Sequence, residues 1–117
     1  MKEKILIAID SSDSSGKILD YGINLAEKLD AEVTVVHAIE PYSKRSTIMN
    51  QLNAAMVKQT NELYELAGKE LMDAAKKQTA GAKVPVHYET LIGNAAQQIL
   101  TAAKKSGCTM IVIGSRG

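Results

Sequence analysis

The sequence has few aromatic residues and almost no cysteine or proline. It contains four Tyr, no Phe, no Trp, one Cys and two Pro among 117 residues. Four tyrosines are too few to build a platform on which nucleic-acid bases stack. The single cysteine, Cys108, cannot close an internal disulfide, so we expect a reducing, cytoplasmic setting. No apolar run approaches the length of about 18 residues that spans a bilayer, and we expect no membrane partner.

Neither sign of charge dominates the chain. Its 14 basic and 13 acidic residues leave a formal net charge of +1. This balance gives no electrostatic reason to expect a nucleic acid or an anionic membrane as partner. The two histidines and the cysteine do not have the spacing of a structural zinc site. The length and the apolar content of 45% are those of one ordinary globular domain.

The first third of the chain alternates between strand and helix patterns. A continuous apolar run over residues 4–9 ends at Asp10, which is typical of a strand covered on both faces. A serine-rich turn follows, and apolar residues at helical spacing then predict a helix over residues 14–29. The β-branched residues after it predict a second strand over residues 32–39.

A long helical pattern covers residues 48–79, after a polar loop. A straight helix of this length would reach about 48 Å, far longer than a short strand. We therefore expect a kink, a break or an overhang near Thr60. The stripe expected to face the core consists of Met49, Leu52, Met56, Leu63, Ala67, Leu71 and Ala74.

The last third predicts a strand, a helix and a strand. Apolar residues alternate with others from Val84 to Glu89, and Pro85 suits a strand at the edge of a sheet. A helix is expected over residues 94–106 and a final strand over residues 109–113, which should be central because its apolar run is continuous. Alternating strands and helices predict a parallel sheet with helices on both faces.

Two of these strands end in residues suited to a ligand. The first ends at Asp10, and the fourth ends at Gly114, with Gly117 three positions later. In open parallel sheets, ligands bind at the carboxyl ends of the strands. A carboxylate that can bind a ribose hydroxyl, beside a glycine loop that can bind phosphate, indicates a nucleotide. The alternative is structural: Asp10 can hold the serine-rich turn, and the glycines can form a tight turn.

Three segments resemble the universal stress protein family: Ile7–Ser12, Val36–Ile39 and Ile111–Gly117. The resemblance extends over the whole chain, and its last segment is the most specific. It implies an α/β fold, an open, doubly wound, Rossmann-like parallel sheet in strand order 3-2-1-4, in a protein that is usually a homodimer.

The ATP-binding branch of that family carries Gly-x-x-Gly, nine residues and then Gly-Ser or Gly-Thr. Gly114 and Gly117 match the first two positions. The later part of the motif, the helix after it and the fifth strand are missing from these 117 residues. We therefore expect residues 1–117 to form one domain that is C-terminally incomplete, with the outer edge of its fourth strand uncovered.

The resemblance also implies roles for individual residues. Asp10 would contact the ribose or the adenine, Ala38 would offer backbone groups to the adenine edge, and the glycine loop would line the phosphates. The ligand would be ATP or AMP, and Mg²⁺ could accompany the phosphates near Asp10. The implied nucleotide-binding residues are Ala8, Ile9, Asp10, Ala38, Ile113, Gly114, Arg116 and Gly117.

Three functional hypotheses follow. The leading one is a cytoplasmic, homodimeric stress-response regulator that binds an adenine nucleotide and hydrolyses it slowly at most, because the sequence places no general base or metal constellation. The alternative is a family member that does not bind ATP and acts through dimerisation and protein partners. The last is an enzyme of the ATP α-hydrolase group, whose Ser-Gly-Gly-x-Asp-Ser loop residues 11–15 match only in composition.

Overall fold

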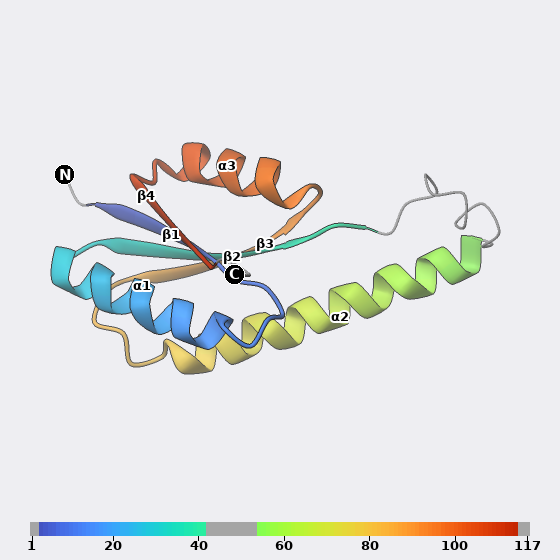
Figure 1. Cartoon of the computed structure of the whole chain (residues 1–117), viewed down its shortest axis with the longest axis horizontal. Coiled ribbons are helices and arrows are strands. Elements are labelled where there is room, and N and C mark those ends of the chain that lie inside the picture. Colours follow the sequence, from blue (N-terminus) through green and yellow to red (C-terminus); the bar gives the residue numbers. More distant parts are fainter. Residues whose placement is uncertain (1–2, 42–53, 115–117) are drawn as a thin grey trace.

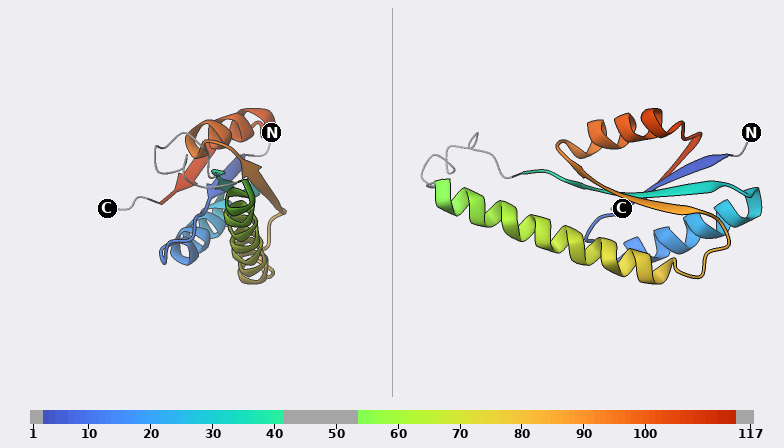
Figure 2. Two further views of the ribbon diagram at one scale, coloured as in Figure 1. Left: turned by 90° about the vertical axis from the view of Figure 1, so that its right-hand side faces the viewer. Right: turned by 180° about the vertical axis from the view of Figure 1, so that it is seen from behind.

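The computed structural model describes residues 3–41 and 54–114 (Figure 1). The strands form one parallel sheet in the order β3-β2-β1-β4. Helices α1 and α2 cover one face of the sheet and α3 covers the other (Figures 1 and 2). The expected fold class and strand order are confirmed. The elements are β1 (Lys4–Ala8), α1 (Ser15–Leu29), β2 (Glu32–Ile39), α2 (Ala54–Gln78), β3 (Val86–Ile92), α3 (Ala95–Ser106) and β4 (Met110–Ile113).

Strand β1 lies inside the sheet and sends side chains into two separate cores. Successive side chains of a strand point to opposite faces. Ile5 and Ile7 pack under α1 and α2, whereas Leu6 and Ala8 pack under α3. The two cores explain why the run is apolar at every position rather than at alternate ones.

Helix α1 begins one residue after the expected start. Its N-cap is Ser14, but no side-chain hydrogen bond caps the helix there. The helix ends at Leu29, and its C-cap, Asp30, adopts a left-handed conformation with φ of 52° and donates its N–H to the carbonyls of Ala26 and Glu27. None of the described helices is both long and apolar enough to cross a membrane.

Helix α2 runs unbroken from Ala54 to Gln78, and its N-terminal half extends beyond the sheet (Figure 1). The expected overhang is therefore confirmed, without a break within those bounds; residues 48–53, with Met49 and Leu52, lie outside the described residues. The prediction of which residues of this helix face the core was wrong. The buried positions are Gly68, Met72 and Ala75. Of the expected stripe, Leu71 is half-buried, and the exposed members are Met56, Leu63, Ala67 and Ala74.

The physical reason is that small side chains let α2 approach the sheet. A Cβ atom on Gly68 would lie 2.9 Å from Ile39 Cδ1 and 3.3 Å from His37 Cδ2. Larger residues on that side would hold the helix away from β2. Hydrophobic periodicity alone counts a leucine as core before a glycine, so it selects the wrong side of this helix.

The bounds of the last two strands also differ from expectation. Strand β3 starts at Val86 rather than Val84 and continues to Ile92, because its last residues stay paired with β2 as far as Ile39. It is an edge strand, as Pro85 predicted. Strand β4, expected to be central in a longer sheet, pairs only with β1 within the described residues, which agrees with the expected order 3-2-1-4; Ile113 is 62% exposed.

Candidate functional site

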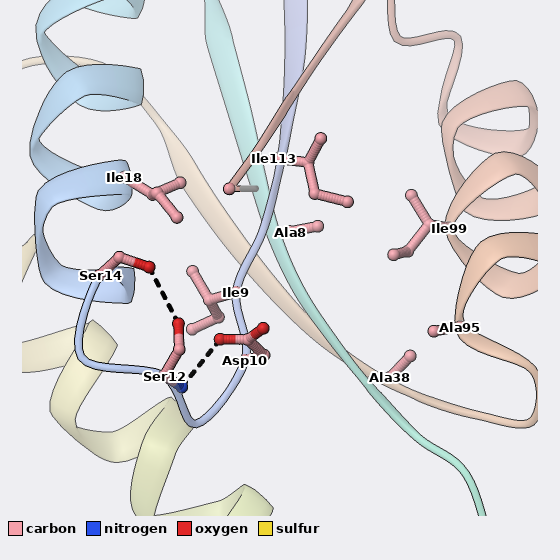
Figure 3. Close-up of a pocket in the computed structure, with 11 residues that line it drawn as sticks. Ala8, Ile9, Asp10, Ser12, Ser14, Ile18, Ala38, Ala95, Ile99 and Ile113 are labelled. Atoms are coloured by element: carbon pink, nitrogen blue, oxygen red, sulfur yellow. Dashed lines mark hydrogen bonds between the residues drawn. The ribbon is translucent and has the colours of Figure 1, made fainter. Parts of the chain in front are cut away.

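A crevice opens where β1, β2 and β4 end, between α1 and α3 (Figure 3). Six of the eight residues expected around a nucleotide line it: Ala8, Ile9, Asp10, Ala38, Ile113 and Gly114. The other two, Arg116 and Gly117, lie outside the described residues. The structure thus brings together residues from three separate segments of the chain, and their part in binding stays a prediction.

Five further residues, which were not predicted from the sequence, also line the crevice. They come from the serine-rich turn and from the two flanking helices. Those at the start of a helix could have been predicted in part, because the first residues of a helix that follows a strand lie at the same edge of the sheet as the end of that strand. Ile18 and Ile99 lie within the expected helices 14–29 and 94–106, but helical spacing alone does not show which residues face the crevice. The five residues are Ser12, Ser14, Ile18, Ala95 and Ile99.

Asp10 holds the turn that follows β1. Its Oδ1 accepts hydrogen bonds from Ser12 N at 2.8 Å and from Ser15 Oγ at 3.3 Å (Figure 3 shows the first). Ser15 Oγ also donates to the Asp10 carbonyl at 2.6 Å. The structural reading of Asp10 is therefore correct. A ligand role is compatible with it, because a carboxylate accepts several hydrogen bonds at once and Asp10 is half-buried on the crevice wall.

Gly114 also has a structural role. A Cβ atom there would lie 3.2 Å from Ile18 Cγ1, so the end of β4 approaches α1 closely only because the residue is glycine. This contact closes one side of the crevice. It explains the first glycine of the pair by packing, before any ligand is considered.

Two helices begin at the crevice. The N-cap of α1 is Ser14 and the first residue of α3 is Ala95. A helix N-terminus carries a partial positive charge and attracts anions. Glu40 shows the effect within the protein, since its Oε1 accepts a hydrogen bond from Ala95 N at 2.9 Å.

The crevice is otherwise apolar. Among its described lining residues, Asp10 is the one ionisable side chain, beside two serines and several aliphatic groups. His37, which does not line the crevice, is hydrogen-bonded through Nδ1 to the Ile9 carbonyl oxygen at 3.0 Å. No three His, Cys, Asp or Glu residues in the described part of the chain gather as a metal site. The arrangement suits an apolar ring with polar groups at its rim.

Similarity to known proteins was assessed by sequence and by structure. A model of the universal stress protein family matches residues 1–117. Universal stress protein YxiE of Bacillus subtilis is 33% identical over 121 residues, which cover 100% of this chain and 81% of that protein. A universal stress protein of Methanocaldococcus jannaschii is 30% identical over 115 residues, covering 98% of this chain but only 65% of that protein.

Solved structures share the fold. Universal stress protein UspA from Lactobacillus plantarum has a TM-score of 0.81 and 19% identity, covering 98% of this chain and 78% of that one. A universal stress protein in complex with cAMP has a TM-score of 0.69 at 20% identity, covering 96% and 75%. One from Archaeoglobus fulgidus in complex with dAMP has a TM-score of 0.67 at 20% identity, covering 97% and 82%. On the family match and the sequence identities, this chain belongs to the universal stress protein family.

Proposed function

We propose that this protein is a regulatory module that binds an adenine nucleotide in the crevice at the ends of β1, β2 and β4. The observation that carries the proposal is the crevice itself. An apolar slot, one carboxylate and two helix N-termini meet at the edge where parallel sheets bind ligands. The cAMP and dAMP complexes of family members support the ligand class.

The proposed pose follows from the chemistry of the wall. The adenine ring lies against Ala8, Ile9 and Ile99, with the backbone of Ala38 at its polar edge. The Asp10 carboxylate accepts hydrogen bonds from ribose hydroxyls or from the adenine amino group. The phosphates extend toward the start of α1 and Gly114, where backbone N–H groups and the helix dipole favour an anion. Arg116 and Gly117 follow Gly114 closely in the sequence.

We propose binding rather than efficient catalysis. Asp10 is the one titratable side chain among the described lining residues, so a carboxylate is present without a second group to pair with it as acid or base. ATP would be accompanied by Mg²⁺, for which Asp10 is the available carboxylate ligand. The occupied protein would then act in the cytoplasm through protein partners, as a homodimer.

Calorimetric titration of ATP and AMP, with and without Mg²⁺, tests the proposal. We expect binding to the wild-type protein and a loss of about tenfold or more in affinity for Asp10→Ala, because a hydrogen bond to a charged group contributes about 1.5–3 kcal/mol. Asp13→Ala is the matched control: it removes a carboxylate from the same turn, but Asp13 does not line the crevice.

Circular dichroism of both variants separates a lost contact from a lost fold. Ser15 Oγ still reaches the backbone carbonyl of residue 10 in Asp10→Ala, so the turn should persist. Equal affinity in Asp10→Ala and wild type would contradict the site. Absence of binding to the wild type by either nucleotide would contradict the proposed function as a whole.

A further inference from the structure

Helix α2 carries a second apolar stripe, on the side away from the core. Leu63 is 65% exposed and Leu66 is 54% exposed. Leu63 precedes the buried Met72 by nine residues, and Leu66 precedes the buried Ala75 by nine. Nine residues correspond to about two and a half helical turns, so each leucine lies opposite a core residue. The stripe is therefore separate from the face that packs on the sheet.

No described element covers this stripe. The N-terminal half of α2 projects past the sheet, and α1 lies beside the other half (Figures 1 and 2). Met56, one helical repeat before Leu63, is also 46% exposed. Met56, Leu63 and Leu66 have the spacing of seam positions in a coiled coil, in which such residues face another helix. The remaining seam positions of this repeat, Gln59, Glu70 and Asp73, are polar, so the apolar seam is short.

The charges beside the stripe indicate that the partner helix is α2 of a second copy of this chain. Glu62 and Lys69 are seven residues apart and form a row along one flank of Leu63 and Leu66. If a second copy of α2 lies antiparallel, with Leu63 opposite the second copy's Leu66, the same flanks of both helices face each other. Glu62 then lies opposite Lys69 of the second copy, and Lys69 opposite its Glu62. Both charge pairs are complementary.

The other flank carries no charge. Thr60 and Ala67, again seven residues apart, would face each other across the same antiparallel pair. Small side chains there let two helices approach closely. A parallel pairing would instead place Glu62 opposite Ala67 and leave both charges without a counterpart. The flanks thus favour the antiparallel arrangement over the parallel one.

We propose that the outer side of α2 is a self-association surface, which pairs with the same surface of a second copy in antiparallel orientation. The two-fold axis passes between Leu63 and Leu66. One patch serves both copies, as in any isologous contact. Because a single helix pair is smaller than a standard interface, the association is weak and depends on concentration. The contact lies away from the nucleotide crevice and does not depend on its occupant.

Sedimentation velocity over a concentration series, up to millimolar protein, tests the proposal. The wild type should self-associate. Glu62→Lys places a second lysine opposite Lys69 in both pairs and should raise the dissociation constant about tenfold or more, since like charges across an interface are costly. The double variant Glu62→Lys/Lys69→Glu restores opposite charges and should restore association.

Glu65→Lys is the matched control, with the same charge change on the same helix outside both flanking rows, and it should associate like the wild type. Leu63→Asp should abolish the contact while leaving helix content unchanged, because Leu63 is exposed. A monomeric wild type, or association unchanged by Glu62→Lys, would overturn the proposal. Failure of the double variant to recover would overturn the antiparallel register.

Discussion

At the scale of the residue, glycines in the helices allow them to approach the sheet closely. Gly22 in α1 is buried against β1, and a Cβ atom there would lie 2.8 Å from Ile7 Cγ1. Ile7 is fully buried, so it has no free space to move into. The glycine therefore costs helix propensity but permits the packing of α1 on the sheet.

Gly22→Ala should destabilise the protein by about 1–3 kcal/mol, because overpacking of a core exceeds the gain in helix propensity. Gly16→Ala is the matched control in the same helix. Its Cβ atom would have no neighbour closer than 3.7 Å, so it should leave stability unchanged or raise it. Urea unfolding of the two variants measures the difference, and a Gly22→Ala protein as stable as the wild type would refute this account of the packing.

Cys108 lies half-buried after α3, packed on the core beneath that helix. Burial raises the pKa of its thiol; Glu32 adds to the rise and Lys4 opposes it. A raised pKa keeps the reactive thiolate scarce until the pH is higher. The rate of alkylation by iodoacetamide should therefore rise at higher pH in the folded protein than in urea. A folded-state midpoint at or below the unfolded one would contradict this.

At the scale of the element, the two halves of α2 differ in how they are supported. Its C-terminal half is fixed by core contacts and by Gln78, whose Nε2 donates to the Gly16 carbonyl at 2.7 Å and to Asp20 Oδ1 at 2.8 Å. Its N-terminal half has exposed side chains at nearly every position. Helices without tertiary packing are marginally stable in water.

Amide hydrogen exchange should show this division. In dilute protein, residues 54–66 should exchange faster than residues 68–78, because local opening there breaks few buried contacts. Raising the protein concentration should slow exchange around Leu63 and Leu66 if α2 pairs with itself. Uniform protection along α2 at low concentration would show that the overhang has support from elsewhere.

The sequence predicted most of the elements and part of the candidate site. Apolar runs were sufficient to predict β1 and β2, and helical spacing was sufficient to predict α1 and α3. Both patterns reflect the burial of residues within one segment, so they can be recognised without knowledge of the rest of the fold. The core side of α2 was not predictable in this way, since Gly68 and Ala75 gain their importance from the sheet beneath them. Ile99 lines the crevice because of the way α3 crosses the sheet, which the sequence of α3 alone does not show.

At the scale of the whole molecule, the candidate site brings together three strands and the two helices that flank them. Strand β4 contacts the sheet through β1 alone within the described residues, whereas the crevice is lined by β1, β2, β4 and both flanking helices. A ligand held there would contact all of these elements at once. Binding should therefore stabilise the fold as a unit.

AMP or ATP at a hundred times its dissociation constant should raise the free energy of unfolding by about 2.7 kcal/mol. Thermal unfolding with increasing nucleotide measures the shift. The shift should shrink in Asp10→Ala and persist in Asp13→Ala. A melting temperature that does not change with saturating nucleotide would mean that the ligand does not distinguish the folded from the unfolded chain.

One imidazole connects the crevice with the long helix. His37 Nδ1 is hydrogen-bonded to the Ile9 carbonyl next to Asp10, and its Cδ2 would lie 3.3 Å from a Cβ atom on Gly68. A substitution that removes this imidazole would therefore alter two places at once, the hydrogen bond at the end of β1 and the packing of α2 on the sheet.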